Sequence, residues 1–272
     1  MNLLKSITYL SLVIFALPGC NNPTPKKGIP ESGKTSDTLL VTSEHTDSIQ
    51  EDTTVFPITI LTTGTFHNDE VGENVGNMKW IGLFKGPNGN YLKETKLKIS
   101  QVYDPVLDED ESIKTGWEVS TSGKDTTIIL IQALPYLKNG KIRSVPITKN
   151  YIYPGEQISF NYLGIDYELF ATGNKKKENP DSDWYIVSNY KLYLRAKING
   201  KTQKTLLTSH NRFDEAMVNL IFAGDLDGDG IIDIILDNTY HYNLTDPTLY
   251  LSRPAGKGQI VKSVGSHYSV GC

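Results

Sequence analysis

The apolar and polar residues in the second half of the chain alternate as they do in β-strands. From Tyr190 to Ile198, an apolar side chain occupies every second position, and mostly polar side chains fill the positions between. Successive side chains of a strand point to opposite faces, so this stretch predicts a strand with one buried and one solvated face. Asn199-Gly200 follows, a dipeptide that favours a type I′ turn because both central residues need positive φ. Residues 201–207 continue the pattern and predict the second arm of a hairpin.

Other strand-like runs, separated by turn-forming residues, cover most of the chain from residue 55 onward. They span residues 55–61, 78–84, 91–99, 117–120, 126–131, 158–162, 165–170, 218–223 and 231–236. The only helix that the pattern predicts is a short one around residues 214–220. No segment recurs at a fixed period, which argues against a complete propeller. We therefore expect an all-β fold of mostly antiparallel hairpins, with at most one or two short helices.

Composition supports this fold class and narrows the partners. The 15 Tyr, 23 Gly and 13 Pro favour strands and turns. With 27 basic and 31 acidic side chains the net charge is −4, which argues against a nucleic-acid partner because phosphate binding needs a basic face. The acidic run 108–111 and the basic run 175–177 are expected to be solvated loop tips.

The first twenty residues have the organisation of a secretory signal. Lys5 precedes an apolar stretch from Ile7 to Leu17, whose helical length of about 16 Å is too short to cross a bilayer. The sequence Leu17-Pro18-Gly19-Cys20 resembles the lipobox of bacterial lipoproteins, although Pro18 departs from the usual small residue. The resemblance implies that residues 1–19 are a lipoprotein signal peptide and that Cys20 carries a diacylglyceryl group.

This resemblance leads to expectations about domains and location. Residues 20–54 are polar and contain no aromatic residue, so we expect a disordered, lipid-anchored tether. Residues 55–272 are expected to form a single β-rich domain, because no change in composition divides them. The lipid on Cys20 would attach the protein to the cell envelope, in the outer membrane, with the domain facing the periplasm or the surface. Cys272 then has no intramolecular partner and would be either buried or available to another chain.

One loop concentrates carboxylates in a metal-binding pattern. Asp225, Asp227 and Asp229 alternate, Gly230 permits a sharp turn, and Asp233 comes four residues after Asp229. In a tight loop the alternate carboxylates converge, the main-chain carbonyl of Ile231 supplies the seventh position, and Asp233 supplies the ninth. These ligands are all oxygen atoms, which suits Ca²⁺ better than zinc or copper. Two carboxylates about 5 Å apart repel by roughly 3 kcal/mol at an effective dielectric of 20, so a divalent cation is expected.

The loop resembles that of a known class of calcium-binding hairpins. The pattern Asp-x-Asp-x-Asp-Gly-x-x-Asp at residues 225–233 is similar to the calcium loops of FG-GAP and integrin-α-type propeller blades. The resemblance covers about 25 residues and implies bound Ca²⁺, not the whole fold. An EF-hand does not fit, because Leu236 occupies the position of its bidentate Glu. The end of the chain also resembles bacterial envelope proteins that carry one such loop.

An enzymatic interpretation of the same loop is less favourable. Residues 221–228 resemble the first motif of haloacid-dehalogenase phosphatases, but Asp229 replaces the expected Thr. Only 43 residues follow Asp229, too few for that fold. We identify no catalytic residue and no organic cofactor, and we favour a non-enzymatic role. The expected function is binding, adhesion or assembly, with an envelope protein or a glycan as partner. The alternative is a hydrolase that acts on envelope or extracellular polymers.

Overall fold

The hairpin predicted around Asn199-Gly200 is present in the computed structural model, which describes residues 56–271. Strand β11 (Tyr185–Ile198) pairs antiparallel with β12 (Lys201–Arg212), and the two turn residues have φ values of 50° and 75°. These positive values are those of a type I′ turn. The alternating apolar residues of β11, from Tyr190 to Ala196, are buried as the pattern predicts.

The described residues are all-β, as expected, and form neither a closed barrel nor a propeller. Their helical structure is confined to one 3-10 turn, η1 (Val75–Asn77). The strands form antiparallel sheets, which we letter A to E. Sheet A contains, in spatial order, β1 (Ile60–Leu61), β7 (Thr126–Gln132), β3 (Trp80–Gly86), β4 (Gly89–Thr95) and β8 (Gly140–Lys141). Sheet B contains β2 (Gly64–Phe66), β6 (Gly116–Thr121) and β5 (Leu97–Val102).

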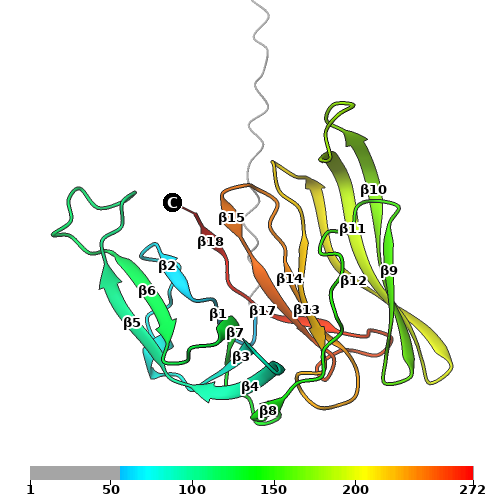
Figure 1. Ribbon diagram of the computed structural model, residues 1–272, viewed down its shortest axis with the longest axis horizontal. Helices are drawn as coiled ribbons and strands as arrows, with labels where there is room; N and C mark the ends of the chain where they lie inside the picture. Colours follow the sequence, from blue (N-terminus) through cyan, green and yellow to red (C-terminus); the bar gives the residue numbers. More distant parts are fainter. Residues whose placement is uncertain (1–55, 272) are drawn as a thin grey trace, which may run out of the picture. The chain divides into compact units, whose positions relative to one another are not determined.

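The remaining strands follow along the chain in meander order. Sheet C contains β13 (Asn219–Gly224), β14 (Asp233–Asp237), β16 (Pro247–Leu251) and β17 (Lys262–Ser266). Sheet D contains β12, β11, β10 (Ile165–Lys177) and β9 (Gln157–Tyr162), and sheet E pairs β15 (Leu244–Thr245) with β18 (Ser269–Val270). Figure 1 shows sheet C, in orange and red, between sheet A and sheet D.

Three hydrophobic clusters join these sheets face to face. In β14, Ile234 and Leu236 belong to the cluster between sheets C and D, whereas Ile235 belongs to the cluster between sheets A and C. A third cluster lies between sheets A and B, where Leu130 of β7 packs with Trp80. Because successive side chains of a strand point to opposite faces, β7 and β14 each contribute side chains to the two clusters on either side of their sheet. Sheet C is therefore buried on both faces, which explains its continuous apolar strands.

The short helix expected around Asp214–Leu220 is absent, and that prediction is wrong. Asp214 forms a parallel bridge with His241, Glu215 has a φ of 47°, and β13 begins at Asn219. Met217 and Val218 are both buried in the C–D cluster. Both residues pack into this cluster from the segment that leads into β13, so tertiary packing overrides the local pattern.

The acidic run 108–111 differs in part from the expected solvated loop. Residues 109–111 are exposed, but Asp108 is buried and accepts hydrogen bonds from Thr115 Oγ1 at 2.6 Å and from the Asp104 N–H at 2.8 Å. Although burial disfavours its charge, these hydrogen bonds hold the pKa of Asp108 below its ordinary value. The basic run 175–177 is exposed, as expected, but it lies at the end of β10 and not in a loop.

Several sequence predictions concern parts of the chain outside residues 56–271. These are the signal peptide, the lipidation site Cys20, the tether and Cys272. Within residues 56–271, no helix is long and apolar enough to cross a membrane.

Candidate metal centre

The carboxylate loop connects two neighbouring strands of sheet C. Strand β13 ends at Gly224 and β14 begins at Asp233, and these two residues are paired across the strands. The loop is held in place from both sides. Leu226 is buried in the A–C cluster and Ile232 in the C–D cluster. The loop is therefore anchored by apolar side chains that its polar pattern does not reveal.

Two glycines give the loop its sharp turns. Gly228 and Gly230 have φ values of 74° and 86°, a region that residues with a Cβ rarely adopt. The turn predicted at Gly230 is thus present, and a second one occurs at Gly228. These turns place the side chains at alternate positions on the inner side of the loop.

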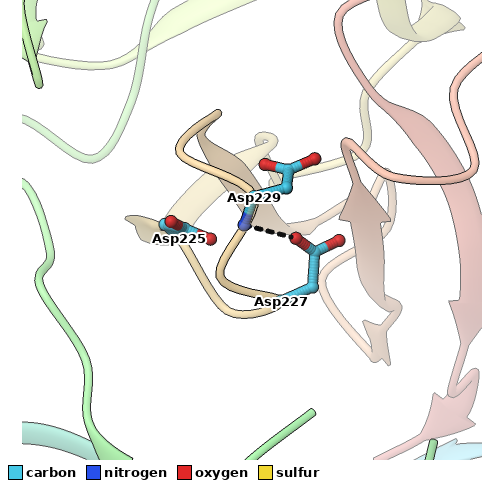
Figure 2. A group of neighbouring side chains, drawn as sticks. All are labelled: Asp225, Asp227 and Asp229. Carbon is cyan, nitrogen blue, oxygen red and sulfur yellow. Dashed lines mark hydrogen bonds between the residues drawn. The ribbon is translucent and has the colours of Figure 1, made fainter. Parts of the chain in front are cut away.

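The structure brings three of the predicted carboxylates together. One oxygen of each of Asp225, Asp227 and Asp229 lies within 4.8 Å of the others, and Figure 2 shows the three side chains around the loop. Asp227 is buried, Asp225 is half-buried and Asp229 is exposed. The group offers only oxygen atoms and is open to solvent on one side. These three residues could hold a hard divalent cation.

Main-chain N–H groups fix the orientation of the three carboxylates. Asp225 accepts hydrogen bonds from Gly228 at 2.7 Å and from Gly230 at 2.9 Å, one on each oxygen. Asp229 accepts from Ile231 at 2.8 Å, and Asp227 accepts from the Asp229 N–H at 3.2 Å, which is the dashed line in Figure 2. Hydrogen bonds within the loop thus help to orient all three carboxylates.

Asp233 lies outside this group of three. It is fully buried, and one of its oxygens accepts from the Leu226 N–H at 2.6 Å and the Asp227 N–H at 3.3 Å. Burial, and secondarily the charge of Asp227, raises the pKa of Asp233 well above its ordinary range. Through these hydrogen bonds Asp233 holds the first half of the loop in place from its buried side. Its predicted role as the ninth-position ligand, and that of the Ile231 carbonyl as the seventh, stay predictions.

Two residues next to the loop were not predicted. Ser252 Oγ lies 2.9 Å from Asp229 Oδ2 and 3.0 Å from Asp233 Oδ1. Arg253 donates from Nη2 to the main-chain oxygen of Asp227 at 3.1 Å, and its Nε lies 3.7 Å from Asp227 Oδ2. Both residues follow β16, which pairs with β14, and only this pairing brings them to the loop. No local sequence signal could have found them.

Without a cation, the three loop carboxylates carry more negative charge than the nearby guanidinium of Arg253 can balance. Burial and the neighbouring charge of Asp229 raise the pKa of Asp227, although Arg253 opposes this shift. At an effective dielectric of 20, each pair of carboxylates about 5 Å apart repels by roughly 3 kcal/mol. Arg253 is close to only one of the three. A divalent cation would relieve repulsion that this single guanidinium leaves in place.

A cavity of about 480 Å³ opens beside the loop. Asp225, Asp227 and Gly228 form one wall, and the segment from Lys138 to Arg143 forms another. Tyr136 and Tyr162 also contribute to the lining. The cavity is of the size that small ligands occupy in proteins, about 300–1,000 Å³.

No protein-family model, no curated protein and no solved structure matches this chain. Its fold class therefore follows from the described residues alone.

Proposed function

We propose that this chain is a lipid-anchored protein of the bacterial cell envelope whose β-rich domain carries a structural Ca²⁺ site. Its role is binding, adhesion or assembly, and its partner is an envelope protein or a glycan. The lipid on Cys20 attaches it to a membrane, which we place at the outer membrane with the domain facing the periplasm or the surface. The lipobox-like Leu17–Cys20 supports the anchor and the location.

The observation that carries the calcium proposal is the convergence of Asp225, Asp227 and Asp229 within 4.8 Å in a loop with two left-handed glycines. The resemblance of residues 225–233 to FG-GAP and integrin-α-type loops supports the same ion. Ca²⁺ accepts six to eight oxygen ligands in flexible geometry, so water and the Ile231 carbonyl can complete the shell. Asp233 would act as a ligand or would support the loop from below.

A structural role for the ion follows from where the loop lies. The loop links two strands of sheet C, which is buried against both sheet A and sheet D. Asp229 also accepts a hydrogen bond from Ser252, the residue that directly follows β16. Binding of Ca²⁺ to the native loop, and not to the unfolded chain, would stabilise the native state by linkage.

The hydrolase alternative has one observation in its favour. Asp225 and Asp227 lie on the wall of the same cavity, and retaining glycosidases use a carboxylate pair about 5 Å apart. Against it, both oxygens of Asp225 accept hydrogen bonds from the loop main chain. Those bonds engage both oxygens of Asp225 in holding the loop, which favours a structural role for this carboxylate. Release of reducing ends from envelope polysaccharides, abolished in Asp227→Asn, would favour the hydrolase.

Thermal melting of the purified chain tests the calcium proposal. At ten times the dissociation constant, linkage contributes about 1.4 kcal/mol, which raises Tm by about 3–6 °C for a domain of this size. We expect this rise with Ca²⁺, a smaller one with Mg²⁺, and its reversal by chelator. Asp225→Asn and Asp229→Asn should reduce the rise, whereas Asp183→Asn, an exposed carboxylate outside the loop, should not. Equal Tm values under all three conditions would contradict the proposal.

A further inference from the structure

The charged residues that line the cavity beside the candidate calcium loop have a net positive charge. Lys138, Lys141 and Arg143 contribute three positive charges, whereas Asp225 and Asp227 contribute two negative charges. None of these three basic side chains forms an ion pair with a described residue. By contrast, Lys149, Lys175 and Arg195 each lie within 4.0 Å of a glutamate. The cavity thus gathers cations whose charge is not already balanced by a close carboxylate.

The basic segment is held firmly against the strand that leads into the loop. Val145 donates its N–H to the Ala223 oxygen at 2.8 Å, and Ser144 forms an antiparallel bridge with Gly224. The approach is so close that a Cβ on Gly224 would lie 2.7 Å from the Arg143 oxygen. In an extended segment, side chains two positions apart point to the same side, so Lys141 and Arg143 share a face. The basic wall and the loop are therefore fixed relative to each other.

A hydroxyl group lies between the two charged walls. Tyr162 lines the cavity, and its hydroxyl is 3.4 Å from the Arg143 main-chain oxygen. Burial, with a contribution from the charge of Asp225, raises the pKa of Tyr162, and the charge of Arg143 opposes that shift. The hydroxyl therefore contacts both the basic segment and the start of the loop.

We propose that this cavity binds an oxyanion, either a carboxylate or a phosphate ester, on a sugar-sized ligand, and that Ca²⁺ in the loop strengthens this binding. The inference rests on the proposed calcium function and names the ligand class of the same region. Without the ion, Asp225 and Asp227 offset most of the basic charge of the lining. A bound Ca²⁺ adds two positive charges and neutralises these carboxylates, which leaves Lys138, Lys141 and Arg143 to attract the anion.

The coupling must act in both directions. If Ca²⁺ raises the affinity for the anion by a given factor, the anion raises the affinity for Ca²⁺ by the same factor. Couplings between neighbouring sites are commonly about 5- to 150-fold, and two sites that share a wall should reach at least the lower value.

Calorimetric titration of the full chain tests this inference with three sugars of similar size. Glucuronate carries a carboxylate, glucose 6-phosphate carries a phosphate ester, and glucose carries no charge. We expect one or both charged sugars to bind at least about fivefold more tightly in millimolar Ca²⁺ than in chelator, and glucose not to bind. The charged sugar that binds more tightly identifies the ligand chemistry. Equal binding of glucose, or no saturable binding of any of the three, would overturn the inference.

Variants locate the binding and separate the two proposals. Arg143→Gln and Lys141→Gln should weaken the charged sugar at least about fivefold while leaving the direct Ca²⁺ titration unchanged. Lys114→Gln, at an exposed lysine that does not line the cavity, is the matched control and should bind like the parent chain. Ca²⁺ binding without any anion binding would overturn the cavity inference alone. An absence of Ca²⁺ binding would overturn the proposed function, and the coupling with it.

Discussion

The main-chain N–H of Ser252 donates to Asp233 Oδ1 at 2.8 Å, although 19 residues separate them in the chain. The hydroxyl of the same serine lies 3.0 Å from that oxygen and 2.9 Å from Asp229 Oδ2. A hydroxyl has one hydrogen to donate, so Ser252 Oγ cannot fully satisfy both carboxylates. Ser252 therefore connects the buried carboxylate beneath the loop with one of the carboxylates that converge above it.

Substitutions at these two residues should destabilise the protein to different extents. Ser252→Ala removes one hydrogen bond to a carboxylate but leaves the main-chain bond, so we expect a loss of about 1–2 kcal/mol. Asp233→Ala removes the acceptor for four donor groups in a buried site, and we expect a loss of at least about 3 kcal/mol. Equilibrium unfolding in urea measures both. Ser263→Ala, in β17, is the control and should change stability by less than about 0.5 kcal/mol.

A histidine–carboxylate pair lies next to sheet B, far from the candidate metal loop in sequence. His67 follows β2 and Asp104 follows β5, and His67 Nδ1 lies 2.5 Å from Asp104 Oδ2. Gly116 of β6 lies next to Asp104, and a Cβ there would be 3.3 Å from the Asp104 Cβ. The bond to Asp104 raises the pKa of His67. Although burial opposes its charge, the bonds from His67 and two main-chain N–H groups lower the pKa of Asp104.

These shifts predict the pH range in which the pair stabilises the fold. The contribution of His67, whose folded-state pKa is raised, is present below about pH 6.5 and is lost as the pH rises through that pKa. The contribution of Asp104, whose pKa is lowered, is present above about pH 3.8 and is lost as the pH falls through that pKa. His67→Gln should therefore lower Tm more at pH 5 than at pH 8.5. Equal losses at both values would contradict a charged pair.

His210 provides a control of opposite sign. Burial lowers its pKa from 6.5 to about 4, so the folded chain resists its protonation. The unfolded chain binds this proton first, and the native state loses stability as the pH falls from about 6.5 towards 4. His210→Gln removes that loss, so its Tm relative to the parent should be higher at pH 5 than at pH 8.5. Melting curves of His67→Gln and His210→Gln, recorded at both pH values, distinguish the loss of the His67–Asp104 pair from a general effect of acid on stability.

The parts of the fold that were predicted correctly depend on neighbouring residues. Asn199-Gly200 specifies its own turn, and the alternation in residues 190–198 specifies which face of β11 is buried. Strand β8 (Gly140–Lys141) gives no such signal, because two residues cannot show a period. It exists because Lys141 pairs with Tyr91 of β4. A strand as short as β8 is specified by tertiary contacts and cannot be predicted from a local pattern.

The candidate site shows the same division. The three alternating carboxylates lie within a five-residue window, so a local pattern is enough to predict that a tight loop brings them together. Asp233 matched the pattern equally well, yet its contacts depend on Leu226 and on Ser252 of a different strand connection. The basic wall of the cavity was also missed, because residues 138–143 are brought to the loop by tertiary contacts, among them the pairing of Ser144 with Gly224.

The anchoring proposal makes a prediction for Cys20. Cys20→Ser should abolish incorporation of a labelled fatty acid, because the lipobox-like segment offers no other thiol for the lipid. The variant should be retained as an uncleaved form or released from the membrane fraction. Metabolic labelling of cells that express the parent or the variant measures this directly. Equal label in both chains would rule out lipid attachment at Cys20.

Gly224 should be among the least replaceable residues near the candidate site. An alanine Cβ would lie 2.7 Å from the Arg143 oxygen and 3.0 Å from the Ser144 Cα, and both are main-chain atoms that cannot rotate away. Gly224→Ala should therefore destabilise the protein by about 1–3 kcal/mol, as overpacking does. The basic segment would also move away from the loop. We expect the variant to show a lower urea midpoint and weaker binding of charged sugars, with Ca²⁺ binding reduced less.

Two other glycines separate this steric effect from backbone strain. Gly230→Ala introduces a Cβ with no atom within 4 Å, but its φ of 86° makes the substitution cost about 1 kcal/mol and should weaken Ca²⁺ binding directly. Gly123→Ala meets only ordinary contacts, the nearest at 3.7 Å, and should be close to neutral. If Gly224→Ala proved as stable as Gly123→Ala, segment 142–145 would not be fixed against β13. The rigid basic wall on which anion binding depends would then be absent.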